Sequence, residues 1–219
     1  MDPAYLAPTP IIDSDHPAIV AFATEAAGDA KDDRERAVNI YYAVRDRIRY
    51  NPYSMILTEE HFRASATLAR EEGFCITKAA LLAAALRAAG IPARLGFADV
   101  KNHLATQKLI DSMGTDLFAY HGYTDVWLDG RWVKATPAFN LSLCEKFRVL
   151  PLEFDGREDS IFHPFDADGR KHMEYVRDRG VFADVPLSEI KVCFEEIYPN
   201  LYKSRDNDFA AEAAAENRT

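Results

Sequence analysis

The stretch from Gly73 to Gly90, GFCITKAALLAAALRAAG, constrains the fold more than any other part of the sequence. It is rich in alanine and leucine and contains no proline, so it predicts a helix that begins at Cys75, after the turn at Gly73. Apolar residues stand on most sides of this helix, which is typical of a buried element. Gly90 ends the helix as a left-handed cap, and the following Ile91-Pro92 prevents its continuation.

Cys75 stands in the first turn of this predicted helix. Backbone N–H groups without helical partners and the positive end of the helix dipole meet there. Both stabilise a thiolate, so we expect a lowered pKa and a nucleophilic sulfur. The alternative is an inert buried cysteine, which is the usual role of this residue type.

The composition limits the class of protein and its partners. The chain has 219 residues, of which 48% are apolar, enough for a core without disulfides. A net charge of −9 argues against nucleic-acid or anionic-membrane partners, which favour a basic face. Three widely spaced cysteines match no zinc pattern and indicate a reducing compartment. The sequence shows no pattern typical of a signal peptide and no apolar run long enough for a membrane span, so we expect a cytoplasmic protein.

The predicted elements run from helices to strands, which favours an α+β fold with an antiparallel sheet over a parallel α/β fold. We expect a single domain over residues 1–202, with its core at about 30–150, a loop-rich extension at 151–202 and a flexible tail at 203–219. Helices are predicted at 16–27, 32–50, 65–71, 75–89, 106–112, 170–177 and 186–198. Strands are predicted at 93–100, 121–128, 131–137 and 141–151.

The dipeptide Asp129-Gly130 predicts a tight β-hairpin. Counting outward from this turn pairs Trp127 with Trp132 and Asp125 with Lys134. We interpret the two tryptophans as packing partners and the charged residues as a cross-strand ion pair.

The same count places His121 at the end of its strand, on one face with Thr136 and Asn140. Both residues are diagonal neighbours of His121, within reach of an imidazole ring. His121 could serve as the base that a Cys75 nucleophile needs, with a polar neighbour fixing its tautomer. The alternative is a strand-end histidine satisfied by solvent.

Two segments, GFCITKAALLAAALRAAGIPARLG and HGYTDVWLDGRWVKATP, resemble the transglutaminase-like branch of the papain-like cysteine enzymes. In that family a cysteine at a helix start is followed by a histidine strand, a hairpin, and an aspartate before proline. The segment VRDRIRYNPY also resembles the family, so the similarity covers residues 45–140. It implies a papain-like fold in which the helix of the nucleophile Cys75 packs on an antiparallel sheet, with His121 as the base.

The chain departs from the family at Thr136, where the family has its aspartate. Three alternatives follow for the third member of the triad. It is Asn140, which can orient the ring as a neutral amide, it is Thr136, or the triad is incomplete. Of the first two we expect Asn140, because its amide oxygen reaches further than the short threonine side chain.

The resemblance also implies an oxyanion hole. The N–H of Cys75 is one natural donor. A second donor is expected from the segment before the helix, with Tyr50, Asn51 and Tyr53 as the candidates.

Two other sets of residues compete with this site. His163, Asp166, Asp168 and His172 could bind a metal, but they stand in a turn-rich segment where aspartate is common anyway. His103 is an alternative base. We expect no cofactor and no metal.

The sequence therefore predicts a thiol enzyme that transfers or hydrolyses an acyl group from a peptide or small amide substrate. The alternative is a non-catalytic module that binds a peptide or protein with a degenerate triad. The sequence does not determine the oligomeric state.

Overall fold

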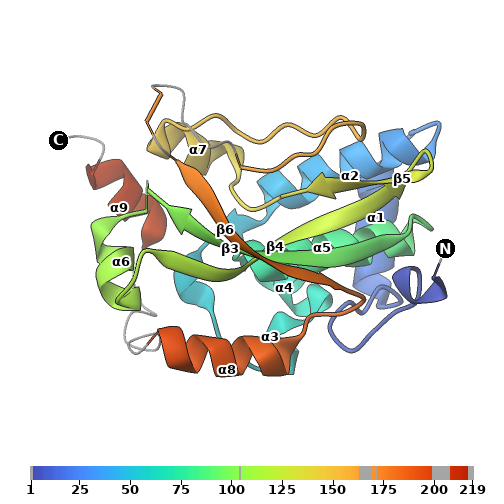
Figure 1. The fold of residues 1–219 in the computed structure, drawn as a ribbon. Helices are drawn as coiled ribbons and strands as arrows, with labels where there is room; N and C mark the ends of the chain where they lie inside the picture. The colour runs from blue at the N-terminus through green and yellow to red at the C-terminus, as the bar shows by residue number, and fades with distance from the viewer. Residues whose placement is uncertain (1, 104, 163–168, 171, 199–207, 217–219) are drawn as a thin grey trace.

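The computed structural model describes residues 2–103, 105–162, 169–170, 172–198 and 208–216. Its centre is a four-stranded antiparallel sheet in the order β5-β4-β3-β6 (Figure 1). The strands of this sheet are β3 (Ala93–Asn102), β4 (Leu117–Leu128), β5 (Arg131–Ala135) and β6 (Met173–Phe182). A short parallel pair lies apart from it, formed by β1 (Arg49–Tyr50) and β2 (Glu72–Gly73). The predicted α+β class with an antiparallel sheet is confirmed.

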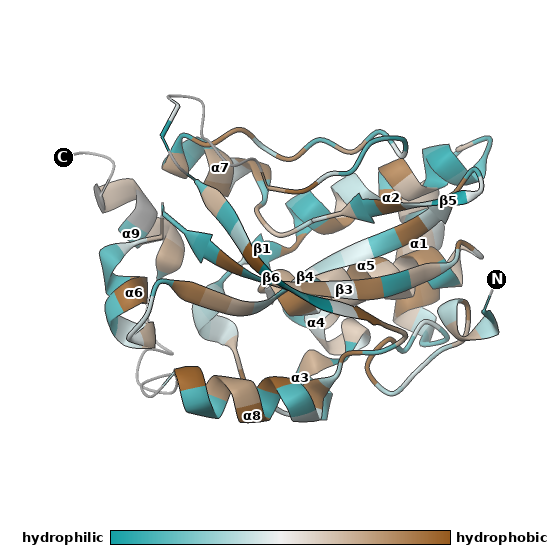
Figure 2. Ribbon diagram, viewed as in Figure 1, coloured by the Kyte–Doolittle hydropathy of each residue, from teal (hydrophilic) through white to brown (hydrophobic). Residues whose placement is uncertain are grey.

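Helices pack against one face of this sheet and at its ends (Figure 1). The helices are α1 (Pro17–Ala27), α2 (Asp33–Arg47), α3 (Glu59–Phe62), α4 (Ala64–Arg70), α5 (Cys75–Ala88), α6 (Gln107–Met113), α7 (Leu141–Phe147), α8 (Leu187–Ile197) and α9 (Phe209–Glu216), with 3-10 turns η1 (Pro3–Tyr5) and η2 (Pro52–Ser54). Figure 2 shows hydrophobic and hydrophilic residues alternating along α8, as expected for a surface helix. Within the described part of the chain, no helix combines the length and apolarity of a membrane span.

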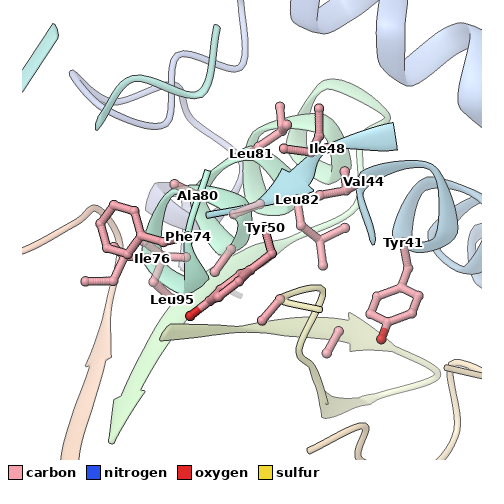
Figure 3. Close-up of a cluster of buried hydrophobic side chains, with 14 of the residues drawn as sticks. Tyr41, Val44, Ile48, Tyr50, Phe74, Ile76, Ala80, Leu81, Leu82 and Leu95 are labelled. Carbon is pink, nitrogen blue, oxygen red and sulfur yellow. The ribbon is translucent and has the colours of Figure 1, made fainter. Parts of the chain in front are cut away.

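Helix α5 is the buried centre of the molecule. Every residue from Ile76 to Arg87 is buried, so the helix has no solvent-facing side. It packs on β3 and β4 and against α1, α2 and α4. Leu81 and Leu82 of α5 lie with Val44 of α2 in one apolar cluster (Figure 3). As predicted, Gly90 takes a left-handed conformation, with φ +78°, just after the helix.

The hairpin between β4 and β5 forms as predicted. Asp129 and Gly130 both have positive φ, and Trp127 pairs with Trp132. Asp125 pairs with Lys134 in register, but its carboxylate bonds Arg94 of β3 instead, at 3.0 Å. The expected Asp125–Lys134 ion pair is therefore wrong, because the third strand brings a closer cation.

Two predicted elements have a different type in the structure. Residues 141–151 begin with helix α7, in which Leu143, Cys144 and Phe147 are buried with helical spacing. Residues 173–177 of the segment predicted as a helix at 170–177 belong instead to strand β6, which pairs with β3. Its residues are mostly exposed, so no apolar alternation marks them as a strand. The unpaired edge of β3 determines their conformation.

The chain beyond residue 203 is not a free tail over its described part. Helix α9 places Phe209 in a buried position against the rings of Tyr50 and Tyr53. Glu212 of the same helix accepts a hydrogen bond from the Tyr53 hydroxyl at 2.7 Å. Figure 1 shows α9 and α6 together at one end of the sheet.

Candidate active site

Cys75 is the first residue of α5 and is half-buried. The helix start is closed by Thr77, whose hydroxyl accepts a hydrogen bond from the Phe74 amide at 3.0 Å. Gly73 is required here for close packing, since a Cβ at that position would lie 2.5 Å from the Thr77 hydroxyl oxygen. These contacts fix the backbone that presents the thiol.

The Cys75 thiol is polarised by backbone amides but strongly desolvated. The N–H groups of Gly122, Ile76 and Cys75 itself favour the thiolate, as the helix-start argument anticipates. Burial has the larger effect and raises the pKa of Cys75 to about 11, although part of the residue still reaches solvent. The expected low pKa is therefore wrong for the resting structure, in which Cys75 is a neutral thiol at pH 7.

Strand β4 approaches this helix start closely. Tyr120 has φ +53°, and the register of β4 against β3 shifts at this point. This register shift marks a β-bulge, which directly precedes His121 and Gly122. A Cβ on Gly122 would lie 3.1 Å from the Ile76 Cα, so glycine is needed for the strand to pass this close. The Gly122 amide thereby reaches the sulfur of Cys75.

His121 lines the same cavity as Cys75 and is 5% exposed. Burial, with a smaller contribution from His172, lowers the pKa of His121 to about 4, so its ring is neutral at pH 7. Its Nε2 atom is buried without a hydrogen-bond partner, and its ring packs on Phe162 with centroids 5.1 Å apart. Among the described residues no hydrogen bond joins this ring to the Cys75 thiol. A neutral thiol and a neutral imidazole thus share one cavity.

Neither expected orienting residue bonds to His121 in this structure. Asn140 accepts a hydrogen bond from the Tyr50 amide at 3.1 Å and donates one to the Ser142 hydroxyl at 2.8 Å. The Thr136 hydroxyl is buried without a partner. Asn140, at the N-cap position of α7, therefore fixes the backbone of Tyr50 and not the imidazole ring.

The three candidate amides for the second oxyanion donor are already used. The Tyr50 amide bonds Asn140, the Asn51 amide bonds the Gly73 carbonyl at 2.9 Å, and the Tyr53 amide bonds the Asn51 side chain at 3.0 Å. The side chain of Tyr50 remains available. It lines the cavity, and burial raises the pKa of its phenol well above the ordinary value, with a smaller contribution from neighbouring Cys75.

The cavity that holds both residues is narrow and apolar. It has a volume of about 50 Å³ and lies between η2, α5, α6, β4 and α8. Tyr198 closes one side of it. Its hydroxyl accepts a hydrogen bond from the Ala119 amide at 2.6 Å and donates one to the Leu117 carbonyl at 3.0 Å. The sequence predicts the helix that ends at Tyr198, but no local pattern indicates where that helix docks.

The competing candidates lie elsewhere. His103 contacts Glu174, with Nε2 and Oε2 3.3 Å apart, and does not line the cavity. Of the possible metal ligands, His163, Asp166 and Asp168 are outside the described residues. Among the residues that the structure describes, no group of three or more His, Cys, Asp or Glu side chains could hold a metal ion. Cys144 is buried in the core. Cys193, on α8, lies near Arg179 of β6.

Comparison with known proteins gives one family and two structural neighbours. The sequence model of the transglutaminase-like superfamily core matches residues 20–137. A candidate cysteine protease from Cytophaga hutchinsonii superimposes with a TM-score of 0.48 and 16% identity, covering 81% of this chain and 53% of that one. A candidate protease from Parabacteroides distasonis superimposes with a TM-score of 0.40 and 19% identity, covering 57% of this chain and 24% of that one.

The chain thus spans about half the length of the first of these proteins and about a quarter of the second. No curated protein matches the sequence.

Proposed function

The chain belongs to the transglutaminase-like superfamily, and from this premise we propose that it is a thiol enzyme that forms an acyl-enzyme on Cys75 with His121 as the base. The observation that carries the proposal is that Cys75 and His121, on separate elements, line one cavity. The substrate class is a peptide or small molecule with an amide or ester bond.

The resting ionisation states determine how the first step proceeds. Because the pKa of Cys75 is raised and that of His121 is lowered, the pair is neutral at pH 7. His121 accepts the thiol proton as the sulfur bonds to the carbonyl carbon of the substrate. The tetrahedral intermediate then expels the amine or alcohol, which takes the proton back from the imidazolium ring. A thioester on Cys75 remains.

The second step regenerates the thiol. Water attacks the thioester in a hydrolase and an amine attacks it in a transamidase, with His121 again removing the proton of the attacking group. The thioester bond breaks, and the sulfur recovers the proton. Both outcomes use the same residues, so the choice between them depends on which nucleophile enters the cavity.

Two groups are suited to stabilise the oxyanion. The N–H of Cys75 stands at the positive end of α5, and the phenol of Tyr50 lines the same cavity. Asn140, through its bond to the Tyr50 amide, is a positioning residue for that phenol.

The test is to trap the acyl-enzyme. The protein is mixed with p-nitrophenyl acetate, quenched in acid, and mapped by mass spectrometry. We expect one acetyl group on Cys75, its absence in Cys75→Ala, and slower formation in His121→Ala. Cys193→Ala is the matched control, since Cys193 lies outside the cavity, and it should acylate like the wild type. Acylation of Cys193 in preference to Cys75 would reject the proposal.

A second function, a peptide-binding module without catalysis, is favoured by one observation. The family's aspartate position holds Thr136, which does not bond to His121. Under this proposal the wild type binds short peptides but never acylates, and Thr136→Asp restores a measurable acylation rate.

Three cysteines occur as free thiols. A reducing compartment, which we propose to be the cytoplasm, would keep Cys75 in the reactive form.

A further inference from the structure

We propose that the cavity beside Cys75 is a subsite for a short, neutral, apolar acyl chain. This inference rests on the proposed function, because it assigns the chain attached to the carbonyl that Cys75 attacks. It adds a substrate class that neither the family nor the structural neighbours specify.

The chemistry of the walls excludes charged acyl groups. The cavity is lined by Tyr50, Pro52, Tyr53, Met55, Phe74, Cys75, Leu109, Ser112, Met113, Phe118, Ala119, His121, Phe194 and Tyr198. Of the lining side chains that the structure describes, none is an aspartate, glutamate, lysine or arginine. A carboxylate or ammonium group entering the cavity would lose its hydration without gaining a counter-ion, which is unfavourable.

The size of the cavity limits the length of the chain. Its volume is about 50 Å³. A cavity needs about 10–15 Å³ to hold one water, and one of about 150 Å³ binds benzene, so this cavity admits only a few carbon atoms. A butanoyl group is therefore expected to fit better than an octanoyl group.

The walls next to β4 are held in place by hydrogen bonds, so they cannot move aside freely. The Tyr198 hydroxyl is bonded to two backbone groups of β4. Tyr53 is tied to Glu212 of α9, whose carboxylate also contacts Lys108 of α6 at 2.8 Å. Met113 of α6 is a flexible part of the lining and is therefore the best position at which to alter the subsite.

The experiment measures binding without chemistry. The ¹⁵N-labelled Cys75→Ala protein is titrated with butanamide, octanamide and succinamic acid, which is butanamide with a terminal carboxylate. We expect butanamide to shift the amide signals of the cavity and to bind at least about tenfold more tightly than succinamic acid or octanamide.

Two variants of Met113 test the assignment. Met113→Lys should abolish butanamide binding, whereas the matched control Val192→Lys, on the exposed side of α8, should not. If Met113→Lys does not fold, Met113→Ala gives the answer, because the larger space should shift the preference from butanamide to hexanamide.

The outcomes separate the two proposals. Equal binding of butanamide and succinamic acid, no binding of any amide, or no change in preference in Met113→Ala would overturn the subsite. Selective butanamide binding together with a wild-type protein that p-nitrophenyl butyrate never acylates would uphold the subsite and reject the enzyme.

Discussion

The most informative prediction concerns the pH at which Cys75 reacts with iodoacetamide. Burial raises the pKa of Cys75 to about 11, against an ordinary value of 9.0. At pH 7 the thiolate is then about 100-fold scarcer than in an ordinary cysteine. A more basic thiolate is a better nucleophile, with a Brønsted slope of about 0.4–0.5, which recovers about tenfold. We therefore expect Cys75 at pH 7 to react about tenfold more slowly than a free thiol.

The assay is timed alkylation from pH 5 to 10.5, with each cysteine quantified by mass mapping and glutathione as the reference thiol. The logarithm of the Cys75 rate should rise by about one for each pH unit and reach no plateau below pH 10. Cys75→Ser identifies the signal from the other cysteines. A plateau that begins near pH 5, with Cys75 faster than glutathione at pH 6, would refute the reasoning. It would mean that the three amides and His121 outweigh burial and form a thiolate–imidazolium pair.

Four further outcomes are expected. Tyr50→Phe should lower kcat for ester hydrolysis by about 10²-fold with little change in KM, as loss of an oxyanion donor does, in stopped-flow assays. Tyr198→Phe should lower the free energy of unfolding by about 1–3 kcal/mol in urea titrations, because two backbone groups of β4 lose their partner. Asn140→Ala should cost a similar amount in the same titrations, whereas Thr136→Val, which removes an unpartnered buried hydroxyl, should be neutral or stabilising. Burial lowers the pKa of His121 from 6.5 to about 4, so the unfolded chain binds this proton more readily than the folded one. The contribution of His121 to the free energy of unfolding is therefore complete above pH 6.5 and falls by about 3 kcal/mol as the pH drops to 4. His121→Gln should remove this pH dependence.

The elements that carry the proposed site could be predicted because their signals are local. Between Cys75 and Ala88 alanine and leucine side chains occur on every face of the helix, and only a buried helix removes all of them from water. Asp129-Gly130 supplies the two positive φ values of a tight hairpin, and the pairing of Trp127 with Trp132 follows by counting. His121 then follows from its distance to that turn.

Elements that depend on distant partners could not be predicted in the same way. Strand β6 has a polar, exposed sequence and forms because the edge of β3 accepts it. Helix α9 lacks a strong apolar stripe, yet it docks through Phe209 and Glu212 onto rings that come from η2 and β1. In both cases the partner lies far away in the chain, so no window of sequence contains it.

The sequence by itself determined which groups we propose to react, because a thiol at a helix start and an imidazole on a strand are set by residue type and local periodicity. Only the tertiary structure decided their state. Burial raises the pKa of Cys75, against the direction that the helix dipole alone predicts, and lowers the pKa of His121. The fold also directs the amide of Asn140 to Tyr50. Desolvation depends on which atoms fill the surrounding space, and those atoms come from segments separated along the chain.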